Sequence, residues 1–343
     1  MSGSMRVWRL RQFGVDNLER ADIPIPPVGE GELLIRVAAV SLNYRDSLVA
    51  EGRLLAEPPA LPFTPVSDFA GAVVETGAGV TRFRVGDRVM GNFWTRWIDG
   101  EPPVSLCRYG ESLGGPLPGA LADYIVLPET VAVRSPSSLS DEQASTLPIA
   151  ALTAWFALVE TGRLAAGESV LIQGTGGVSL FGLQIARALG ARTIVLSRDA
   201  AKLRRVEALG ADHGVDTSQT PEWSAAVLAL TDGRGVNHIL ETIGGDNLRR
   251  SMEALASGGR ISQIGLLAGE TLQFPALPFM LRRAILQGVA VGHRRAFEDL
   301  VEAIDRLAIA PVVDHVYGFD EAPKAFAHLG RGPFGKVIVS MAR

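Results

Sequence analysis

One glycine-rich segment has the residue spacing that suits dinucleotide binding. An apolar run at residues 169–173 leads directly into Gly-Thr-Gly-Gly-Val-Ser at 174–179. Gly174 permits a tight turn, Gly176 lets the backbone approach a phosphate, and the helix expected next presents free N–H groups and its positive dipole end. Ser179 replaces the third glycine of the usual fingerprint and is still small. A plain glycine-rich turn is the alternative for the motif alone; the predicted dinucleotide contacts are Gly174, Thr175, Gly176, Gly177 and Val178.

The end of the next expected strand indicates which dinucleotide is bound. A protein that binds NAD usually places Asp or Glu there to accept from the ribose 2′-OH. This chain has Ser197 and Arg198 at that point, with Lys202 one turn further. A hydroxyl and two cationic side chains suit a 2′-phosphate, so we predict that these three residues contact NADPH. Two alternatives stay open: Asp199 binds the ribose of NADH, or the two cations are a solvated helix start.

The expected strands and helices change character along the chain. Up to about residue 130, short strands separated by glycines predominate, and residues 92–119 are expected to form a long loop. From about residue 140, strand and helix candidates alternate, which predicts a parallel, doubly wound sheet. We therefore predict an α/β domain inserted into a β-rich domain that is split between the two ends of the chain. The expected strands are 33–40, 68–75, 87–90, 170–173, 193–196, 236–241, 260–264 and 335–339, and the expected helices are 178–189, 199–209, 246–256 and 296–307.

The composition is that of an ordinary globular protein. With 343 residues, 47% of them hydrophobic and 20% charged, the chain is long enough for two domains with a sizeable core. The formal net charge of −4 gives no reason to expect a nucleic-acid or membrane-surface partner. No apolar run reaches the ~18–20 residues that a membrane-spanning helix needs. The single cysteine fits a reducing compartment and there is no signal-peptide pattern, so a cytoplasmic location is expected.

In these motifs and their order, the chain resembles the medium-chain dehydrogenase/reductase superfamily over nearly its whole length. The resemblance is to the zinc-independent branch, which is quinone oxidoreductase-like or zinc-free alcohol dehydrogenase-like. It is carried, in chain order, by Gly-Glu-Gly-Glu-Leu-Leu-Ile-Arg-Val at 29–37, Ser-Leu-Asn-Tyr-Arg-Asp at 41–46, Gly-Asp-Arg-Val at 86–89, Leu-Pro-Ile-Ala-Ala-Leu-Thr-Ala-Trp at 147–155 and the glycine segment.

The resemblance implies an architecture. It implies a GroES-like β-rich catalytic domain at residues 1–130 and 270–343 and a Rossmann dinucleotide-binding domain at residues 131–269, with the active site in the cleft between them. It also implies a homodimer in which the Rossmann sheets pair edge to edge around residues 285–292.

The resemblance further implies where a catalytic zinc would be bound. Zinc enzymes of the family usually place a cysteine where this chain has Asn43, a Gly-His-Glu where it has Val-Ser-Asp at 66–68, and a third ligand where it has Ile149. A catalytic zinc needs about three protein ligands drawn from Cys, His, Asp and Glu, and only Asp68 is of that kind. All five histidines follow residue 200, and the one cysteine cannot supply the four that a structural zinc lobe needs. We therefore predict that no metal is bound.

The segment after residue 41 supplies the candidate catalytic residues. In the resembled family it faces the nicotinamide, and the Tyr44 phenol and the Asn43 amide can donate to a developing oxyanion. Asp46 and Arg45 are expected to hold Tyr44 or the ribose in place. As alternatives, Asn43 is a helix cap and the other two form a structural ion pair. Position in the family pattern implies further cofactor contacts at Asn43, Thr153, Ile264, Gly265, Gly292, Arg294 and Lys336, with simple strand-end packing as the alternative for the later ones.

These residues together predict a reaction. Without zinc, polarising a plain carbonyl must rely on hydrogen-bond donors, and a conjugated acceptor lowers that demand because the charge delocalises onto oxygen. We predict an NAD(P)H-dependent oxidoreductase that transfers a hydride to an activated double bond or a quinone in a small-molecule substrate. Two alternatives stay open: a zinc-free alcohol dehydrogenase acting on alcohols and aldehydes, and a non-catalytic NADPH-binding protein with a redox-sensing or structural role.

Overall fold

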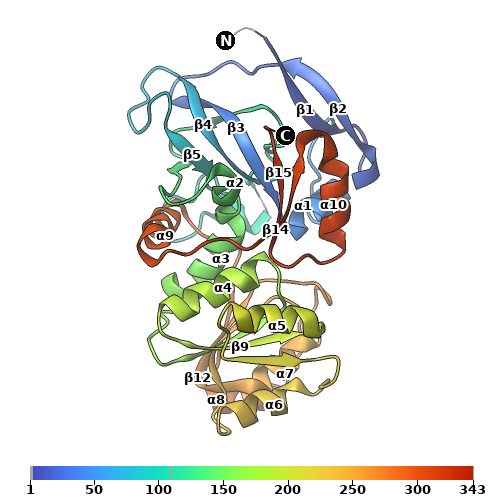
Figure 1. The fold of residues 1–343 in the computed structure, drawn as a ribbon, viewed down its shortest axis with the longest axis vertical. Coiled ribbons are helices and arrows are strands. Elements are labelled where there is room, and N and C mark those ends of the chain that lie inside the picture. Colours follow the sequence, from blue (N-terminus) through green and yellow to red (C-terminus); the bar gives the residue numbers. More distant parts are fainter. Residues whose placement is uncertain (1–2, 109, 343) are drawn as a thin grey trace. The chain divides into compact units, whose positions relative to one another are not determined.

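The computed structural model describes residues 3–108 and 110–342, and the chain divides into two compact units (Figure 1). Unit 1 comprises Met1–Leu152 and Gly292–Arg343, and unit 2 comprises Thr153–Val291. Both boundaries lie later in the chain than the predicted positions after residues 130 and 269, so the predicted domain limits are corrected here.

Contacts near the two boundaries explain the correction. The Ile149 N–H donates to the Asp68 carboxylate at 3.3 Å, and Arg88 pairs with Asp141 at 2.7 Å, so the segment after residue 130 packs with unit 1. At the other boundary, strand β13 (Ile285–Gly288) extends the sheet of unit 2 past residue 269. This strand has only four residues, too few to show a clear alternation of apolar and polar positions.

A seven-stranded sheet forms the centre of unit 1. Its order is β14-β15-β3-β4-β5-β7, and β6 also pairs with β3. The C-terminal β15 pairs with the N-terminal β3, and Figure 1 shows the red β14 and β15 beside the blue β3. The strands are β3 (Glu32–Leu42), β4 (Asp68–Thr76), β5 (Arg88–Gly91), β6 (Tyr124–Pro128), β7 (Ala132–Arg134), β14 (Val313–Gly318) and β15 (Lys336–Ser340).

Alternation along β3 explains how this sheet buries its core. Leu33, Ile35 and Val37 project into one apolar cluster, which Phe69 of β4 and Val339 of β15 join. An antiparallel hairpin, β1 (Ser4–Leu10) and β2 (Leu18–Pro24), forms a separate two-stranded sheet. The other elements of unit 1 are η1 (Val15–Asn17), α1 (Tyr44–Ala50), η2 (Val104–Arg108), α2 (Asp141–Ala144), η3 (Leu147–Ala151), α9 (Arg294–Leu307), η5 (Phe319–Glu321) and α10 (Ala322–Gly330).

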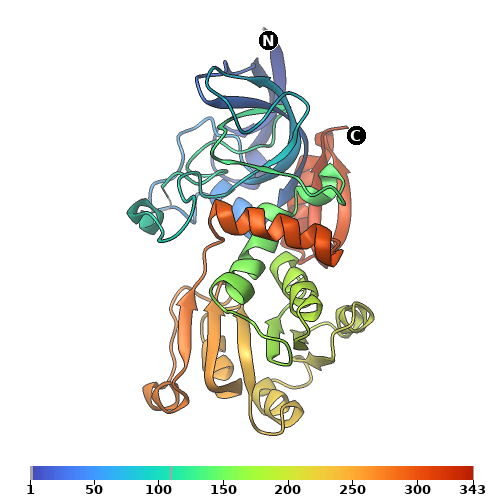
Figure 2. The same cartoon turned by 90° about the vertical axis from the view of Figure 1, so that its left-hand side faces the viewer.

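Unit 2 is a six-stranded sheet in the order β10-β9-β8-β11-β12-β13, and every pairing in it is parallel. This is the doubly wound sheet that the alternating pattern predicts. Figures 1 and 2 show its helices on both faces, with α4 and α5 on one side and α6 and α7 on the other. The strands are β8 (Ser169–Gln173), β9 (Arg192–Ser197), β10 (His213–Asp216), β11 (Val236–Glu241), β12 (Leu255–Gln263) and β13.

The helices of unit 2 follow the strands in alternation. They are η4 (Phe156–Glu160), α4 (Gly177–Ala188), α5 (Ala200–Ala208), α6 (Trp223–Leu230), α7 (Asn247–Ala254) and α8 (Ala276–Arg282), and α3 (Leu152–Trp155) lies at the boundary of the two units. Helices α4, α5, α6 and α7 bury apolar residues against the sheet, whereas α8 has no buried residue. On α5, for example, Leu203 and Val206 are buried while the residues between them are exposed.

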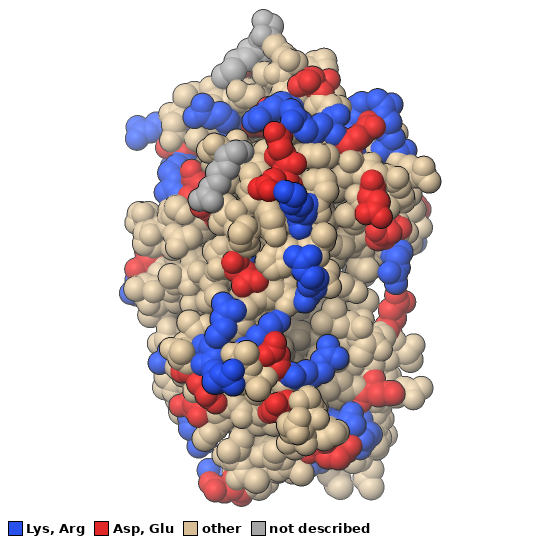
Figure 3. Space-filling view, turned by 45° about the vertical axis from the view of Figure 1, so that its right-hand side comes forward, with Lys and Arg blue, Asp and Glu red and all other residues tan. Residues whose placement is uncertain are grey.

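The surface carries charges of both signs. On the face drawn in Figure 3, Lys and Arg side chains lie interspersed with Asp and Glu. In residues 3–108 and 110–342, no helix combines the length and the apolar character that crossing a bilayer requires.

Candidate active site

The glycine segment lies at the carboxyl end of β8, as its spacing predicts. Gly174 has a φ of +77°, a left-handed conformation that favours glycine. Gly176 is exposed, and a Cβ added to it would meet no atom within 4 Å. Helix α4 starts at the next residue and runs for 12 residues. Open space above backbone at a helix N-terminus is a geometry that accepts a phosphate.

Two residues hold α4 close to the sheet. Ser179 Oγ donates to the carbonyl of Gln173 at 2.7 Å, which ties the first turn of the helix to the end of β8. A Cβ on Gly182 would lie 2.3 Å from the Leu240 side chain on β11, so the helix and the strand touch there. The close approach is therefore made at Gly182, which the sequence reasoning missed. Its signal was a glycine inside a helix, where glycine costs about 1 kcal/mol relative to alanine.

A buried carboxylate supports the same edge of the sheet. Glu241, fully buried at the end of β11, accepts from Gln173 Nε2 at 2.9 Å and from the Ser251 hydroxyl. Its backbone carbonyl accepts from the N–H groups of Ile264 and Gly265, at 2.8 and 3.1 Å. Both predicted residues thus lie next to the end of β11, the strand beside β8. Sequence reasoning did not single out Glu241, because an acidic residue ending a buried strand has no motif around it.

The strand end at which the sequence predicts dinucleotide selection is the end of β9. Asp199 Oδ1 accepts from the N–H groups of Ala201 and Lys202, at 2.8 and 3.1 Å, so this carboxylate caps α5. Ser197 ends β9, and Arg198 follows it at the surface. Thr153, another predicted cofactor contact, is buried at the start of unit 2.

In unit 1, strand register brings three predicted positions together. Strand β3 is antiparallel to both β4 and β15, so its carboxyl end meets the start of each. Ser41 pairs with Asp68, the first residue of β4, and Leu42 pairs with the residue after Lys336, which begins β15. Asn43 follows directly, as the residue before α1. We call Asn43, Asp68 and Lys336 the amide cluster.

Short hydrogen bonds connect the amide cluster. Lys336 Nζ donates to Asn43 Oδ1 at 2.6 Å and to the Leu42 carbonyl at 2.8 Å. Asn43 Nδ2 donates to Asp68 Oδ2 at 2.8 Å, which also accepts from the Ile149 N–H at 3.3 Å. The Lys336 and Asp68 side chains are 3% and 0% exposed, and Nζ lies 4.0 Å from Oδ2. Asp68 Oδ1 is buried without a hydrogen-bond partner among the described residues.

Burial shifts the pKa values of both charged groups of the amide cluster. Desolvation raises the pKa of Asp68 to about 7, against the opposing effects of the Lys336 charge, the Asn43 amide and the Ile149 N–H. Desolvation likewise lowers the pKa of Lys336, against the attraction of the Asp68 and Asp46 carboxylates. Two perturbed groups that touch one amide are typical of functional sites.

The hydrogen bonds of Asp46, one of the predicted catalytic residues, tie the start of α1 to its surroundings. Asp46 is fully buried, and it accepts from the backbone N–H of Asn43 at 2.8 Å and from the Ser67 hydroxyl at 2.8 Å. Arg45 lies 3.8 Å from it and also donates to Ser67 and to the Gly115 carbonyl. Asp46 therefore positions the start of α1, and a direct part in the chemistry stays a prediction.

Tyr44 and the segment at residue 292 complete the predicted residues of unit 1. Tyr44 begins α1, directly after the amide cluster, and is 50% exposed. Gly292 lies just before α9, and Arg294 is the first residue of that helix. Arg294 donates to the Thr130 carbonyl at 2.9 Å and pairs with Glu298 at 3.4 Å, so its guanidinium is held within unit 1.

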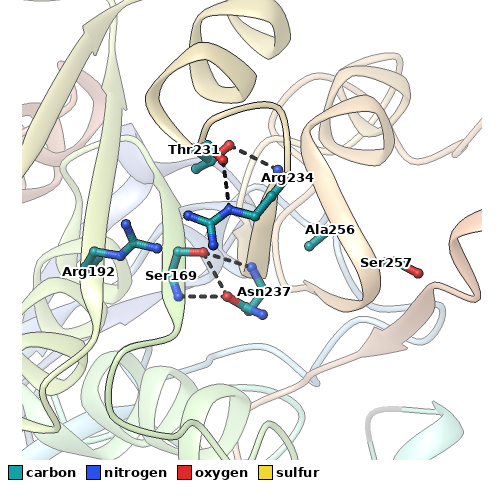
Figure 4. A pocket seen from close by; sticks show the side chains of 8 residues that line it. Ser169, Arg192, Thr231, Arg234, Asn237, Ala256 and Ser257 are labelled. Atoms are coloured by element: carbon teal, nitrogen blue, oxygen red, sulfur yellow. Dashed lines mark hydrogen bonds between the residues drawn. The ribbon is translucent and has the colours of Figure 1, made fainter.

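The hollow drawn in Figure 4 lies away from the predicted site residues. Its volume is about 450 Å³, and it is found at the amino ends of β8, β9 and β11, the opposite edge of the sheet from the glycine segment. Asn237 Oδ1 accepts from both the N–H and the hydroxyl of Ser169, so the polar groups between these strands satisfy one another (Figure 4). None of the predicted site residues lines this hollow among the described residues.

Comparison with known proteins identifies the family. The model of the "Alcohol dehydrogenase GroES-like domain" matches residues 29–137, and that of the "Zinc-binding dehydrogenase" matches residues 177–306. A zinc-type alcohol dehydrogenase-like protein of Schizosaccharomyces pombe is 37% identical over 337 residues, which cover 96% of each chain. This chain belongs to the medium-chain dehydrogenase/reductase superfamily.

Two further similarities agree with this family. A quinone oxidoreductase-like protein 2 homologue of Nematostella vectensis is 30% identical over 326 residues, covering 91% of this chain and 82% of that protein. The structure of a candidate alcohol dehydrogenase from Sinorhizobium meliloti 1021 is 51% identical and superimposes with a TM-score of 0.95, covering 99% of this chain and 100% of that one. The predicted fold, a GroES-like domain with a Rossmann-like sheet, is confirmed, and the chain is an NAD(P)-dependent oxidoreductase of the superfamily.

The family implies zinc, and the residues of this member do not fit it. The three positions that the resemblance assigns to zinc ligands do converge, since Asn43 and Ile149 both donate to Asp68. Two hydrogen-bond donors thus contact the Asp68 carboxylate, and the Lys336 ammonium lies 4.0 Å from it. A divalent cation would need several anionic or neutral donor atoms there and would be repelled by the ammonium. The chain from residue 3 to 342, leaving out residue 109, has no cluster of three His, Cys, Asp or Glu that could hold a metal ion.

Proposed function

We propose that this member of the superfamily is a zinc-independent reductase that uses NADPH to reduce an activated double bond or a quinone. The observation that carries the proposal is the amide cluster, in which Lys336 Nζ lies 2.6 Å from Asn43 Oδ1 and no metal-ligand set is present among the described residues. Hydride addition to a conjugated acceptor leaves a delocalised anion, which hydrogen-bond donors can stabilise without a Lewis acid.

The glycine segment and the end of β9 support the choice of NADPH. The open backbone at Gly176 fits a pyrophosphate. Since Asp199 Oδ1 is engaged in capping α5, we assign the ribose contacts to Ser197, Arg198 and Lys202. A guanidinium and a hydroxyl suit a 2′-phosphate better than a 2′-hydroxyl.

A residue of α1 is suited to the proton transfer that follows hydride transfer. When bound, NADPH would supply the hydride that adds to the acceptor, and NADP⁺ would then be released. A proton must then reach the reduced acceptor, and the half-exposed hydroxyl of Tyr44 is a donor placed beside the amide cluster. Asp46 holds the start of α1, where the backbone of Tyr44 lies.

Binding and turnover measured on one preparation test the proposal. NADPH and NADH are titrated by fluorescence, and NADPH oxidation is then followed with a benzoquinone, an α,β-unsaturated ketone and an enoyl thioester. Primary alcohols with NADP⁺ form the opposing set. We expect tighter binding of NADPH and turnover of at least one conjugated acceptor. Turnover of alcohols alone would favour the alcohol dehydrogenase, and nucleotide binding with no turnover would favour a non-catalytic role.

We also propose that the chain forms a homodimer through unit 2. Strand β13 is the last strand of its sheet, and exposed apolar residues flank it: Ile285 on the strand and Met280 and Leu281 on α8, at 67% and 73% exposure. An open strand edge beside apolar side chains is suited to pairing with a second copy. Sedimentation analysis should give a dimer for the wild type and a monomer for Ile285→Lys, whereas a monomeric wild type would refute this interface.

A further inference from the structure

Lys336 has features of a functional lysine. Its ammonium is almost completely buried and makes two hydrogen bonds, to Asn43 Oδ1 and to the Leu42 carbonyl. An ammonium has three N–H donors, and the third has no acceptor within hydrogen-bond distance among the described residues. Asp68 Oδ1 is similarly unpaired. Buried polar groups that lack a hydrogen-bond partner reduce folding stability, so their presence here calls for an explanation beyond packing.

The two charges dictate the orientation of the Asn43 amide. Its oxygen faces the ammonium at 2.6 Å and its nitrogen faces the Asp68 carboxylate at 2.8 Å. The reversed amide would place N–H groups against the ammonium and the carbonyl against the carboxylate, and both contacts would be repulsive. The charge pair therefore holds one orientation of this side chain.

The same pair binds the side chain of the residue that caps α1. Asn43 is the N-cap residue of α1, and asparagine at this position usually accepts from a backbone N–H of the first helical turn. Asn43 and Asp46 form a capping box at this helix start, and in it Asp46 accepts from the Asn43 N–H at 2.8 Å. The amide that Lys336 and Asp68 orient therefore belongs to the residue that also begins this capping box.

We propose that Lys336 is the resident positive charge of this site and the residue that positions Asn43 for the reaction. The inference rests on the proposed function, because the charge matters when a hydride makes the acceptor anionic. A preorganised cation in a site of low dielectric stabilises such a charge far more than it would in water. Gly335 supports the placement, because its φ is +92° and a Cβ there would lie 2.2 Å from the Val312 carbonyl.

A set of three variants tests the inference. Lys336→Met removes the ammonium but keeps the length of the side chain, and Lys336→Met/Asp68→Asn removes both charges. Lys324→Met is the matched control, because Lys324 is an exposed lysine of unit 1 that pairs with Glu321. For each, kcat and KM for a conjugated acceptor and the free energy of unfolding are measured.

The expected results separate catalysis from packing. Lys336→Met should lower kcat about 100-fold, the typical loss on removing one stabilising donor, with KM changed less than about 3-fold. It should also lose stability, because Asp68 is left as an unpaired buried carboxyl. The double variant should regain stability without regaining kcat, and Lys324→Met should match the wild type. If the double variant regains both, or if Lys336→Met keeps its kcat, Lys336 only balances Asp68 and the inference is wrong.

A structural measurement keeps the test independent of the substrate. In a crystal structure of Lys336→Met, or of the double variant if the single one does not fold, the Asn43 side chain should leave its present orientation, in which the amide oxygen faces residue 336 and the amide nitrogen faces residue 68. An Asn43 side chain that stays in place would overturn the positioning role. If the wild type reduces none of the acceptors, the proposed function fails by itself, and the orientation of Asn43 still decides this inference.

Discussion

The glycine segment of unit 2 and the amide cluster of unit 1 are built in opposite ways. The first uses the backbone of six consecutive residues, and its chemistry follows from missing side chains and free N–H groups. The second joins three side chains, two of them 293 residues apart in the sequence, through the register of three strands. A backbone site depends on local conformation, whereas a side-chain site depends on the whole sheet. Mutations should therefore affect the two regions differently.

The largest effect is expected at the turn of the glycine segment. Gly174→Val places a β-branched residue at a φ of +77°, and Gly233→Val does the same at +76° in an open turn of the same unit. Both should lose similar stability through backbone strain. Only Gly174→Val should weaken NADPH binding, about 100-fold, or ~2.7 kcal/mol, in a fluorescence titration. Equal dissociation constants for the two variants would mean that the segment does not bind the nucleotide.

The second largest effect is expected at the contact between α4 and β11. Gly182→Val adds atoms where a Cβ would already lie 2.3 Å from the Leu240 side chain. Overpacking of this kind costs about 1–3 kcal/mol, which urea unfolding measures. Gly330→Val is the control, since a Cβ there meets no atom within 4 Å. Similar free energies of unfolding for both variants would contradict a close contact between α4 and β11.

A smaller effect distinguishes the two nicotinamide dinucleotides. Arg198→Ala should raise the dissociation constant for NADPH about 10-fold, the loss of one charge-assisted contact, and leave that for NADH unchanged. Arg204→Ala, an exposed arginine on α5, is the matched control and should alter neither constant. Equal losses for both dinucleotides would show that Arg198 does not contact the 2′-phosphate.

The amide cluster should be visible in the pH dependence of stability. The pKa of Asp68 is raised from 3.8 to about 7 in the folded chain, chiefly by burial. The contribution of Asp68 to the free energy of unfolding is therefore fully present below about pH 4, and it is lost as pH rises through about 7.

Asp68→Asn does not titrate and provides the comparison. The free energy of unfolding of the wild type, relative to this variant, should fall by up to ~1.4 kcal/mol per pH unit between about pH 5 and 7. Lys336 acts in the same direction, because without its carboxylate partner its lowered pKa makes the variant gain stability as pH rises. The nearby Asp46 and Arg45 are present in both proteins. Parallel pH curves would show that Asp68 is ionised throughout this range.

The same comparison explains how far the sequence could predict the molecule. Alternating strands and helices gave the doubly wound sheet, and local spacing placed the turn at Gly174 correctly. The unit boundaries were wrong because they depend on long-range contacts such as that of Ile149 with Asp68. Lys336 was named from its place in the family pattern, but its bond to Asn43 depends on strand register, which no short sequence window contains. Glu241 was missed for the same reason.

The most direct test of the account is a measurement of metal content and activity on one preparation. The metal is quantified by mass spectrometry, and NADPH-dependent reduction of a conjugated acceptor is assayed before and after a strong chelator is applied. With Lys336 as the positive charge of the site, we expect well below one zinc per chain and unchanged turnover after chelation. One zinc per chain, together with loss of turnover on its removal, would contradict the account.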